Sequence, residues 1–195
     1  MWHEAAGSGS MGACQRRRTR VLSVISGRPG RPRNHDERAF HRRGHLVRAA
    51  AWRRAAAGAL LTDPAGRVLI VKPNYRDHWT IPGGICEQGE PPHAGCAREV
   101  AEEVGLALPP GPLLAVDWSQ PYGVRDRPIM HFVFDGGTVS EDTRIVVQQE
   151  ELDGYQFADP GRLASYAPRY VTDRIAAALA ARASGAAIYQ PQRIT

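Results

Sequence analysis

The chain has 195 residues, of which 43% are hydrophobic and 23% are charged, and its formal net charge is +5. This length supports one domain with an appendage and leaves too few residues for a second substantial core. The net charge excludes little, because the charge is unevenly spread. Residues 1–54 carry 13 arginines against three acidic side chains, a net charge of +10, whereas residues 55–195 carry 12 basic and 17 acidic side chains, a net charge of −5. The presumptive domain is therefore acidic.

The three cysteines, Cys14, Cys86 and Cys96, have neither the paired spacing of a zinc site nor an even number for a disulfide framework. No apolar run approaches the roughly 18 residues of a membrane-spanning helix. The short stretch Val21–Ile25 is not a convincing signal-peptide core. We therefore expect a soluble cytoplasmic protein that does not bind membranes.

Residues 1–54 are rich in arginine, glycine and proline and show no sustained period of 2 or 3.6. Such a segment buries too little apolar surface to offset the entropy of ordering it. One interpretation is an arginine-rich arm that contacts nucleic acid. We favour the other, a disordered N-terminal extension, which includes the case of an upstream stretch added by a misplaced start codon.

The composition changes after residue 54, where a domain over residues 55–184 is expected to begin. Two short strands, Ala56–Leu61 and Arg67–Lys72, are predicted on either side of a turn at Asp63–Gly66. Farther on, Pro82-Gly83-Gly84 predicts a bend, because glycine adopts backbone angles that side chains forbid.

A helix is predicted over residues 92–104, where small apolar residues recur at helical spacing. Pro91 and Pro92 fit its first turn and Gly105 fits the position just past its end. A second amphipathic helix is predicted over 171–183, and residues 185–195 are expected to be a C-terminal tail. Further strands are predicted over 113–118, 129–134 and 151–157.

The first of these helices carries three glutamates, Glu99, Glu102 and Glu103, at positions i, i+3 and i+4. At about 100° per residue their carboxylates fall on one side of the helix. Crowded like charges are unfavourable, and oxygen ligands of this kind suit a hard cation such as Mg²⁺ or Mn²⁺. An isolated group of this kind would instead indicate a solvated face, with Arg98 paired to Glu102.

The glutamates belong to a longer pattern that argues against the solvated face. Between Gly84 and Leu106 the pattern fixes seven positions: Gly84, Glu90, Arg98, Glu99, Glu102, Glu103 and Gly105. This segment resembles the Nudix box, and the flanking residues from about Ala55 to Leu163 resemble Nudix hydrolases more loosely.

The resemblance implies an α/β fold, an α/β/α sandwich around a mixed β-sheet. It also implies hydrolysis of a nucleoside diphosphate linked to another moiety, by water attacking phosphorus with the help of Mg²⁺ or Mn²⁺. By position, Glu99, Glu102 and Glu103 would be metal ligands, and Glu90 would belong to the metal-binding set as an assisting carboxylate. Glu102, Glu103 and Arg98 would form the catalytic set, with Arg98 as an organiser of the glutamates.

The general base is left open by the resemblance, which allows either a box glutamate or a carboxylate from a later loop. Glu150 and Glu151 lie where such a later carboxylate is expected, and we add Glu151 to the candidate catalytic set. The alternative is an ordinary charge pair at the start of a strand.

Other side chains are weaker candidates. Aromatic residues could stack on a planar ligand but are more often core residues, and loop arginines could bind phosphate but are more often solvated. The histidines lack a metal-ligand spacing, and Cys86 fits a small buried filler better than a reactive thiol. These candidates are Trp118, Tyr122, Phe132, His78, His93, His131, Cys86, Arg76, Arg125 and Arg127.

Two further readings of the function stay open at this point. A Nudix-like binding module could sense a nucleotide without cleaving it, although the intact glutamates argue against this. An RNA-directed hydrolase could use the basic N-terminal arm to capture its substrate. We expect a small-molecule nucleotide or other diphosphate substrate, and the resemblance makes a homodimer plausible.

Overall fold

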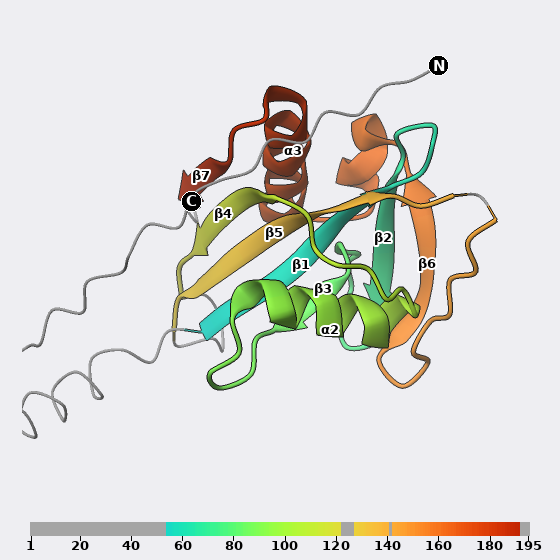
Figure 1. Cartoon of the computed structure of the whole chain (residues 1–195), viewed down its shortest axis with the longest axis horizontal. Helices are drawn as coiled ribbons and strands as arrows, with labels where there is room; N and C mark the ends of the chain where they lie inside the picture. Colours follow the sequence, from blue (N-terminus) through green and yellow to red (C-terminus); the bar gives the residue numbers. More distant parts are fainter. Residues whose placement is uncertain (1–53, 122–126, 141, 192–195) are drawn as a thin grey trace, which may run out of the picture. The chain divides into compact units, whose positions relative to one another are not determined.

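The computed structural model describes residues 54–121, 127–140 and 142–191. The predicted N-terminal extension and the candidates Tyr122 and Arg125 lie outside these residues. Within them the chain forms one mixed sheet with helices on both faces (Figure 1). The predicted α/β/α sandwich is therefore confirmed.

The sheet has seven strands in the order β6-β2-β1-β5-β4-β7, with β3 paired to β1. Strand β1 runs parallel to β5 and antiparallel to both β2 and β3. The strands are β1 (Arg54–Thr62), β2 (Val68–Pro73), β3 (Gly83–Ile85), β4 (Leu113–Ser119), β5 (Ile129–Thr138), β6 (Leu152–Ala158) and β7 (Ile188–Pro191). The helices are α2 (Pro92–Val104), a short 3₁₀ helix (Pro160–Ser165) and α3 (Arg169–Ser184).

The two helices cover opposite faces because side chains alternate along the central strand. Leu60 of β1 packs into a core with Ile175 and Ala178 of α3. Its neighbour Leu61 packs into a second core with Val100 of α2. Each face of the sheet thus has its own apolar core.

The first two strands are joined by the predicted turn but separate directly beyond it. Their ladder contains only the pair Thr62 and Val68, after which β2 pairs with β6. Residues 80–85 enter the gap, since Thr80 bridges to Val71 of β2 and β3 pairs with β1. The inserted segment, which includes the predicted bend, is what opens the hairpin.

The bend depends on two glycines that face each other. Gly83 has a φ of +143°, and a Cβ atom on Gly58 would lie 2.6 Å from the carbonyl oxygen of Pro82. Side chains at these positions would push β3 away from β1. The close approach brings the chain leading into α2 onto the middle of the sheet.

Both predicted helices are present, and each ends at a glycine in the left-handed conformation, Gly105 after α2 and Gly185 after α3. The segment 185–195, which the sequence assigned to a tail, contributes β7 to the sheet. This four-residue strand runs parallel to β4. It is too short to give a readable period of 2.

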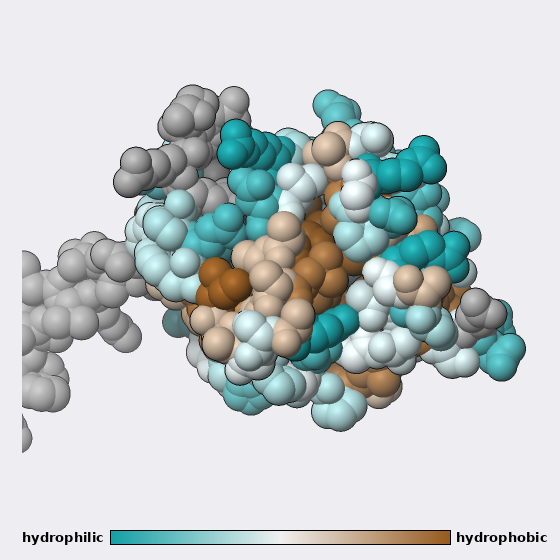
Figure 2. Space-filling view, turned by 90° about the horizontal axis from the view of Figure 1, so that it is seen from above, coloured by the Kyte–Doolittle hydropathy of each residue, from teal (hydrophilic) through white to brown (hydrophobic). Residues whose placement is uncertain are grey.

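The surface mixes polar and apolar residues. Figure 2 shows hydrophilic residues over much of the face seen from above, with an apolar band through its middle. Among the described residues, no helix combines the length and the apolar character that crossing a membrane requires.

Candidate active site

The most deeply placed acidic side chain of α2 is Glu103, whose exposure is only 4%. Its Oε2 atom accepts a hydrogen bond of 2.7 Å from the backbone N–H of Gly83, so the bend before β3 is tied to the last turn of α2. Burial raises the pKa of Glu103 to about 8, and the charges of Glu99 and Glu151 act in the same direction. A buried carboxylate among other anions is a site that a cation would stabilise.

Arg98 connects the remaining carboxylates of the pattern. It donates to both oxygens of Glu90 at 2.9 and 3.0 Å, to Glu99 at 3.0 Å and to Glu102 at 2.9 Å. A further bond of 3.2 Å reaches the carbonyl oxygen of Ile85. These bonds, those to Glu90 above all, raise the pKa of Arg98 and lower that of Glu90 to about 2. One guanidinium thus fixes three carboxylates and the end of β3.

Glu99 packs against the backbone of Gly84. A Cβ atom at Gly84 would lie 2.5 Å from the Glu99 carboxyl group, so that position has no room for a side chain. Burial raises the pKa of Glu99, and the charge of Glu102 adds to this effect. Glu102 itself is half exposed, with 51% of its side chain open to solvent. Of the three helix glutamates, Glu103 is therefore the most buried, Glu99 is intermediate and Glu102 is the most exposed.

The later carboxylates predicted from the sequence lie in a turn between β5 and β6. The N–H of Gln148 donates to the backbone carbonyl of Glu103 at 3.1 Å, and the N–H of Glu151 donates to Gln148 at 3.2 Å. The charge of Glu151 raises the pKa of both Glu103 and Glu99. The fold thus brings Glu151 to the helix glutamates, although 48 residues separate it from Glu103 in the chain.

Asn74, which directly follows β2, binds the same turn. Its backbone N–H donates to the carbonyl of Glu151 at 2.9 Å, and its side chain donates to the carbonyl of Glu150 at 2.7 Å. Asn74 was not predicted from the sequence, because its side-chain partner Glu150 is 76 residues away and no local pattern marks the asparagine. Tyr75, which follows Asn74 and is influenced by the charges of the site glutamates, was not predicted either.

The remaining candidates divide between the site and other places. Arg76 lies near the carboxylates, since its charge lowers the pKa of Glu103. His78 contacts Tyr170 of α3, with 3.0 Å between Nε2 and the phenolic oxygen. Phe132 packs on the core under α2, as expected for an aromatic residue of the core. Trp118 and His131 are half-buried in the sheet, and Cys86 is half-buried just after β3. His93 and Arg127 are exposed.

The donor chemistry of this site fits a hard divalent cation. Its oxygens come from carboxylates, which Mg²⁺ and Mn²⁺ prefer, and the buried Glu103 accepts its hydrogen bond from the backbone N–H of Gly83 and not from a cationic side chain. In the described part of the chain no three histidine, cysteine or acidic side chains converge on a metal position as they stand. Glu90, Glu99 and Glu102 each accept a hydrogen bond from Arg98 instead. A cation held by Glu99 and Glu102 would compete with two of these bonds.

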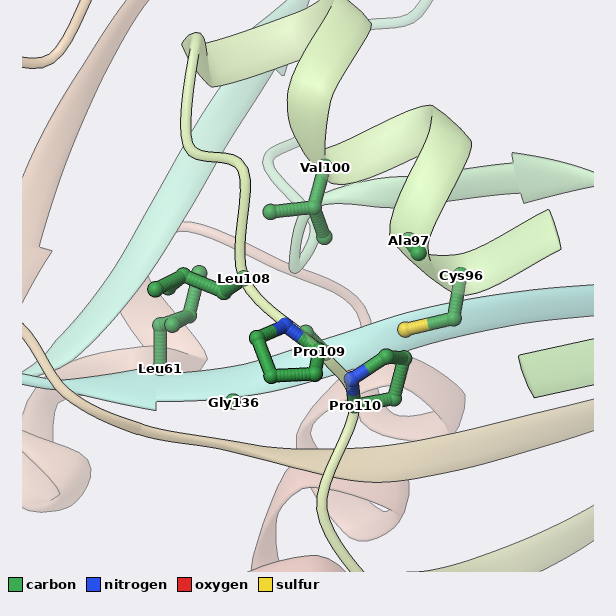
Figure 3. Close-up of a pocket in the computed structure, with 9 residues that line it drawn as sticks. Leu61, Cys96, Ala97, Val100, Leu108, Pro109, Pro110 and Gly136 are labelled. Atoms are coloured by element: carbon green, nitrogen blue, oxygen red, sulfur yellow. The ribbon is translucent and has the colours of Figure 1, made fainter. Parts of the chain in front are cut away.

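A small pocket near α2 is separate from the carboxylates. It is lined by Cys96, Ala97 and Val100 of α2 and by the segment Leu108–Pro110, as Figure 3 shows. No acidic side chain lines the pocket. We therefore place the candidate site at the carboxylates.

Comparison with known structures supports the fold. The MutT protein from Methanosarcina mazei Go1 matches with a TM-score of 0.58 and 21% identity over 68% of this chain and 99% of that one. A UDP-X diphosphatase matches with a TM-score of 0.58 and 19% identity over 77% of this chain and 74% of that one. At these identities the likeness concerns the fold alone.

Sequence relatives match over shorter stretches. A MutT-like protein from Streptomyces ambofaciens is 34% identical over 98 residues, which is 47% of this chain and 60% of that protein. The putative ADP-ribose pyrophosphatase YjhB from Bacillus subtilis is 38% identical over 50 residues, 26% of this chain and 24% of that protein. The chain thus spans between a quarter and three fifths of these relatives. The NUDIX domain model matches residues 52–178, which cover the carboxylates, Arg98 and the Glu151 turn, and the chain therefore belongs to the NUDIX family.

Proposed function

We propose that this protein hydrolyses the pyrophosphate linkage of a nucleoside diphosphate joined to another moiety, by metal-assisted attack of water. Membership of the NUDIX family supports a hydrolase acting on pyrophosphate bonds. The observation that carries the finer proposal is the buried Glu103 carboxylate, which has Glu99 and Glu151 for charged neighbours. Burying acidic groups together is unfavourable for the fold alone, so its presence favours a function that uses them.

We assign the metal to Glu99, Glu102 and Glu103. When bound, Mg²⁺ or Mn²⁺ offsets the charge that develops on the phosphoryl oxygens and lowers the pKa of water. Arg98 is a positioning residue that orients two of these carboxylates through its bonds to Glu99 and Glu102. Both oxygens of Glu90 bind Arg98, so we assign Glu90 to holding that guanidinium.

We assign the general base to Glu151. Its residue is exposed, so its carboxylate can receive a proton from water, and its turn is fixed at both ends by backbone hydrogen bonds. Glu103 is less suited to this task, because burial already favours its protonated form at neutral pH in the absence of a cation. The two carboxylates would thus have separate roles, with Glu103 facing the cation and Glu151 the water.

The test is phosphate release, after coupling to a phosphatase, across a panel of nucleotides and nucleotide sugars with Mg²⁺ or Mn²⁺. We expect metal-dependent turnover that falls by on the order of 100-fold in Glu103→Gln. Glu87→Gln is the matched control, since it makes the same chemical change at an exposed position of the same segment and should leave the rate unchanged. Nucleotide binding without turnover on any panel member would overturn the proposal and support a nucleotide-sensing module.

A further inference from the structure

The loop between β2 and β3 presents an aromatic ring and a cation beside the candidate site. Tyr75 is 62% exposed although it is a large apolar side chain. The guanidinium carbon of Arg76 lies 5.2 Å from the centroid of its ring. Single exposed aromatic side chains are common on protein surfaces, so the position of Tyr75, and not its exposure, makes it a candidate for binding a planar ligand.

The backbone around these two residues is held from several sides. Asn74 ties the loop to the Glu150 and Glu151 turn through two hydrogen bonds. The Nζ atom of Lys72 donates to the carbonyl oxygens of Pro73, at 3.2 Å, and of Arg76. The loop is therefore built to present Tyr75 and Arg76 in a defined position, which lowers the entropy that binding a ligand would cost.

The position is next to the reacting groups. The turn that Asn74 holds is bonded in turn to the end of α2, through Gln148 and the carbonyl of Glu103. Consistent with this chain of contacts, the charges of Glu103, Glu151 and Glu99 all act on Tyr75. A ligand whose phosphates lie at the carboxylates can therefore reach the ring.

We propose that Tyr75 and Arg76 form a recognition shelf on which the nucleobase of the substrate stacks against Tyr75 while Arg76 pairs with a phosphate. This inference rests on the proposed function and names the two residues that bind the nucleobase and a phosphate of its substrate. Stacking of a base on an aromatic side chain is tolerant of base identity, because every base has a π face. Arg76 adds a donor suited to phosphate oxygens. The shelf thus selects nucleosides as a class over diphosphates of saturated rings.

The test compares binding of ADP and inorganic pyrophosphate to the full chain by calorimetry in the presence of Mg²⁺. Tyr75→Ala should weaken ADP binding on the order of 10-fold and leave pyrophosphate binding unchanged. Tyr75→Phe should bind ADP as the unchanged chain does, since it keeps the ring. Arg76→Ala should weaken both ligands by a similar factor, because both carry phosphate.

Tyr189→Ala is the matched control. This tyrosine has nearly the same exposure, 63%, but lies on β7, the edge strand farthest from β6 in the sheet. Equal weakening of ADP and pyrophosphate in Tyr75→Ala, or the same loss in Tyr75→Phe, would overturn the shelf. Binding is measured without turnover, so a chain that binds ADP through Tyr75 and cleaves nothing would contradict the proposed function and leave the shelf standing.

Discussion

Two arginines, one on each face of the sheet, make networks of similar size with different charge balance. Arg182 of α3 donates to both oxygens of Asp135, at 2.6 and 3.1 Å, to Thr62 at 3.0 Å and to the carbonyl of Leu60. Arg98 of α2 binds three glutamates and lies among further acidic side chains. The charges of Arg182 and Asp135 balance each other, and this network serves the fold. The acidic side chains around Arg98 outnumber its single positive charge. The excess marks the site more clearly than the number of hydrogen bonds does.

Removing each arginine should separate these two roles, and here we expect the largest effect. Arg98→Ala should lower kcat/KM on the order of 100-fold, because the carboxylates lose their common anchor. Arg182→Ala should leave kcat/KM nearly unchanged but lower the free energy of unfolding by about 2 kcal/mol, because Asp135 and a backbone carbonyl lose their partner. Steady-state kinetics and urea unfolding of both variants provide the measurement.

The comparison also predicts how each variant responds to metal. Mg²⁺ should raise the melting temperature of Arg98→Ala more than that of Arg182→Ala, because the cation compensates the charges that Arg98 no longer neutralises. Equal kinetic losses in the two variants would show that Arg98 acts only through stability.

The burial of Glu103 beside other acidic side chains should also appear in the pH dependence of stability. The folded pKa of Glu103, about 8, exceeds its ordinary value of 4.5, so the folded chain binds more protons than the unfolded chain between these values. Its contribution to stability is present below about pH 4.5 and is lost as the pH rises to about 8. Glu103→Gln should therefore be more stable than the unchanged chain at pH 8, by roughly a few kcal/mol, and similar to it at pH 4.5. Urea unfolding in EDTA at both pH values measures this.

The metal supplies the control for this prediction. With saturating Mg²⁺ the unchanged chain should recover stability at pH 8, while Glu103→Gln should gain less, because it has lost a ligand. A Glu103→Gln chain that is less stable than the unchanged chain at pH 8 in EDTA would contradict the prediction.

The smallest expected effect concerns Asn74, whose hydrogen bonds go to the Glu150 and Glu151 turn and to neither arginine. Asn74→Ala removes the hydrogen bond to the Glu150 carbonyl and should lower kcat about threefold to tenfold, because the Glu151 turn becomes less fixed. In a Glu151→Gln background the same change should have almost no effect on kcat. A double-mutant cycle measures this coupling, and additive effects of the two changes would show that Asn74 acts elsewhere.

Local patterns allowed much of the fold to be predicted. The helix over 92–104 was predicted from the spacing of its apolar residues. Its end was predicted at Gly105, because the left-handed conformation found there favours glycine. The strand β3 and the separation of β1 from β2 could not be predicted in this way. They depend on Gly58 and Gly83 meeting across the sheet, a contact between residues 25 positions apart.

Some residues of the candidate site could likewise be predicted from the sequence, and others could not. The spacing of Glu99, Glu102 and Glu103 predicted that they share one side of a helix. Glu151 lies close enough for its charge to act on Glu99 and Glu103, and its catalytic role stays a prediction. Asn74 and Tyr75 could not be found from the sequence. Their importance comes from partners on a distant turn, and an asparagine followed by a tyrosine after a strand is otherwise ordinary loop composition.

The hydrogen bond between Gly83 and Glu103 also constrains how this protein can vary. It closes a segment of the chain that begins at the sheet and returns to it one helix later. One residue inserted within α2 before Glu103 would rotate that carboxylate by about 100° and move it about 1.5 Å along the helix axis, away from the Gly83 N–H. Many side chains between them can change without this consequence. The segment should therefore tolerate substitutions far better than insertions or deletions, and natural length variation should collect in the loops outside it.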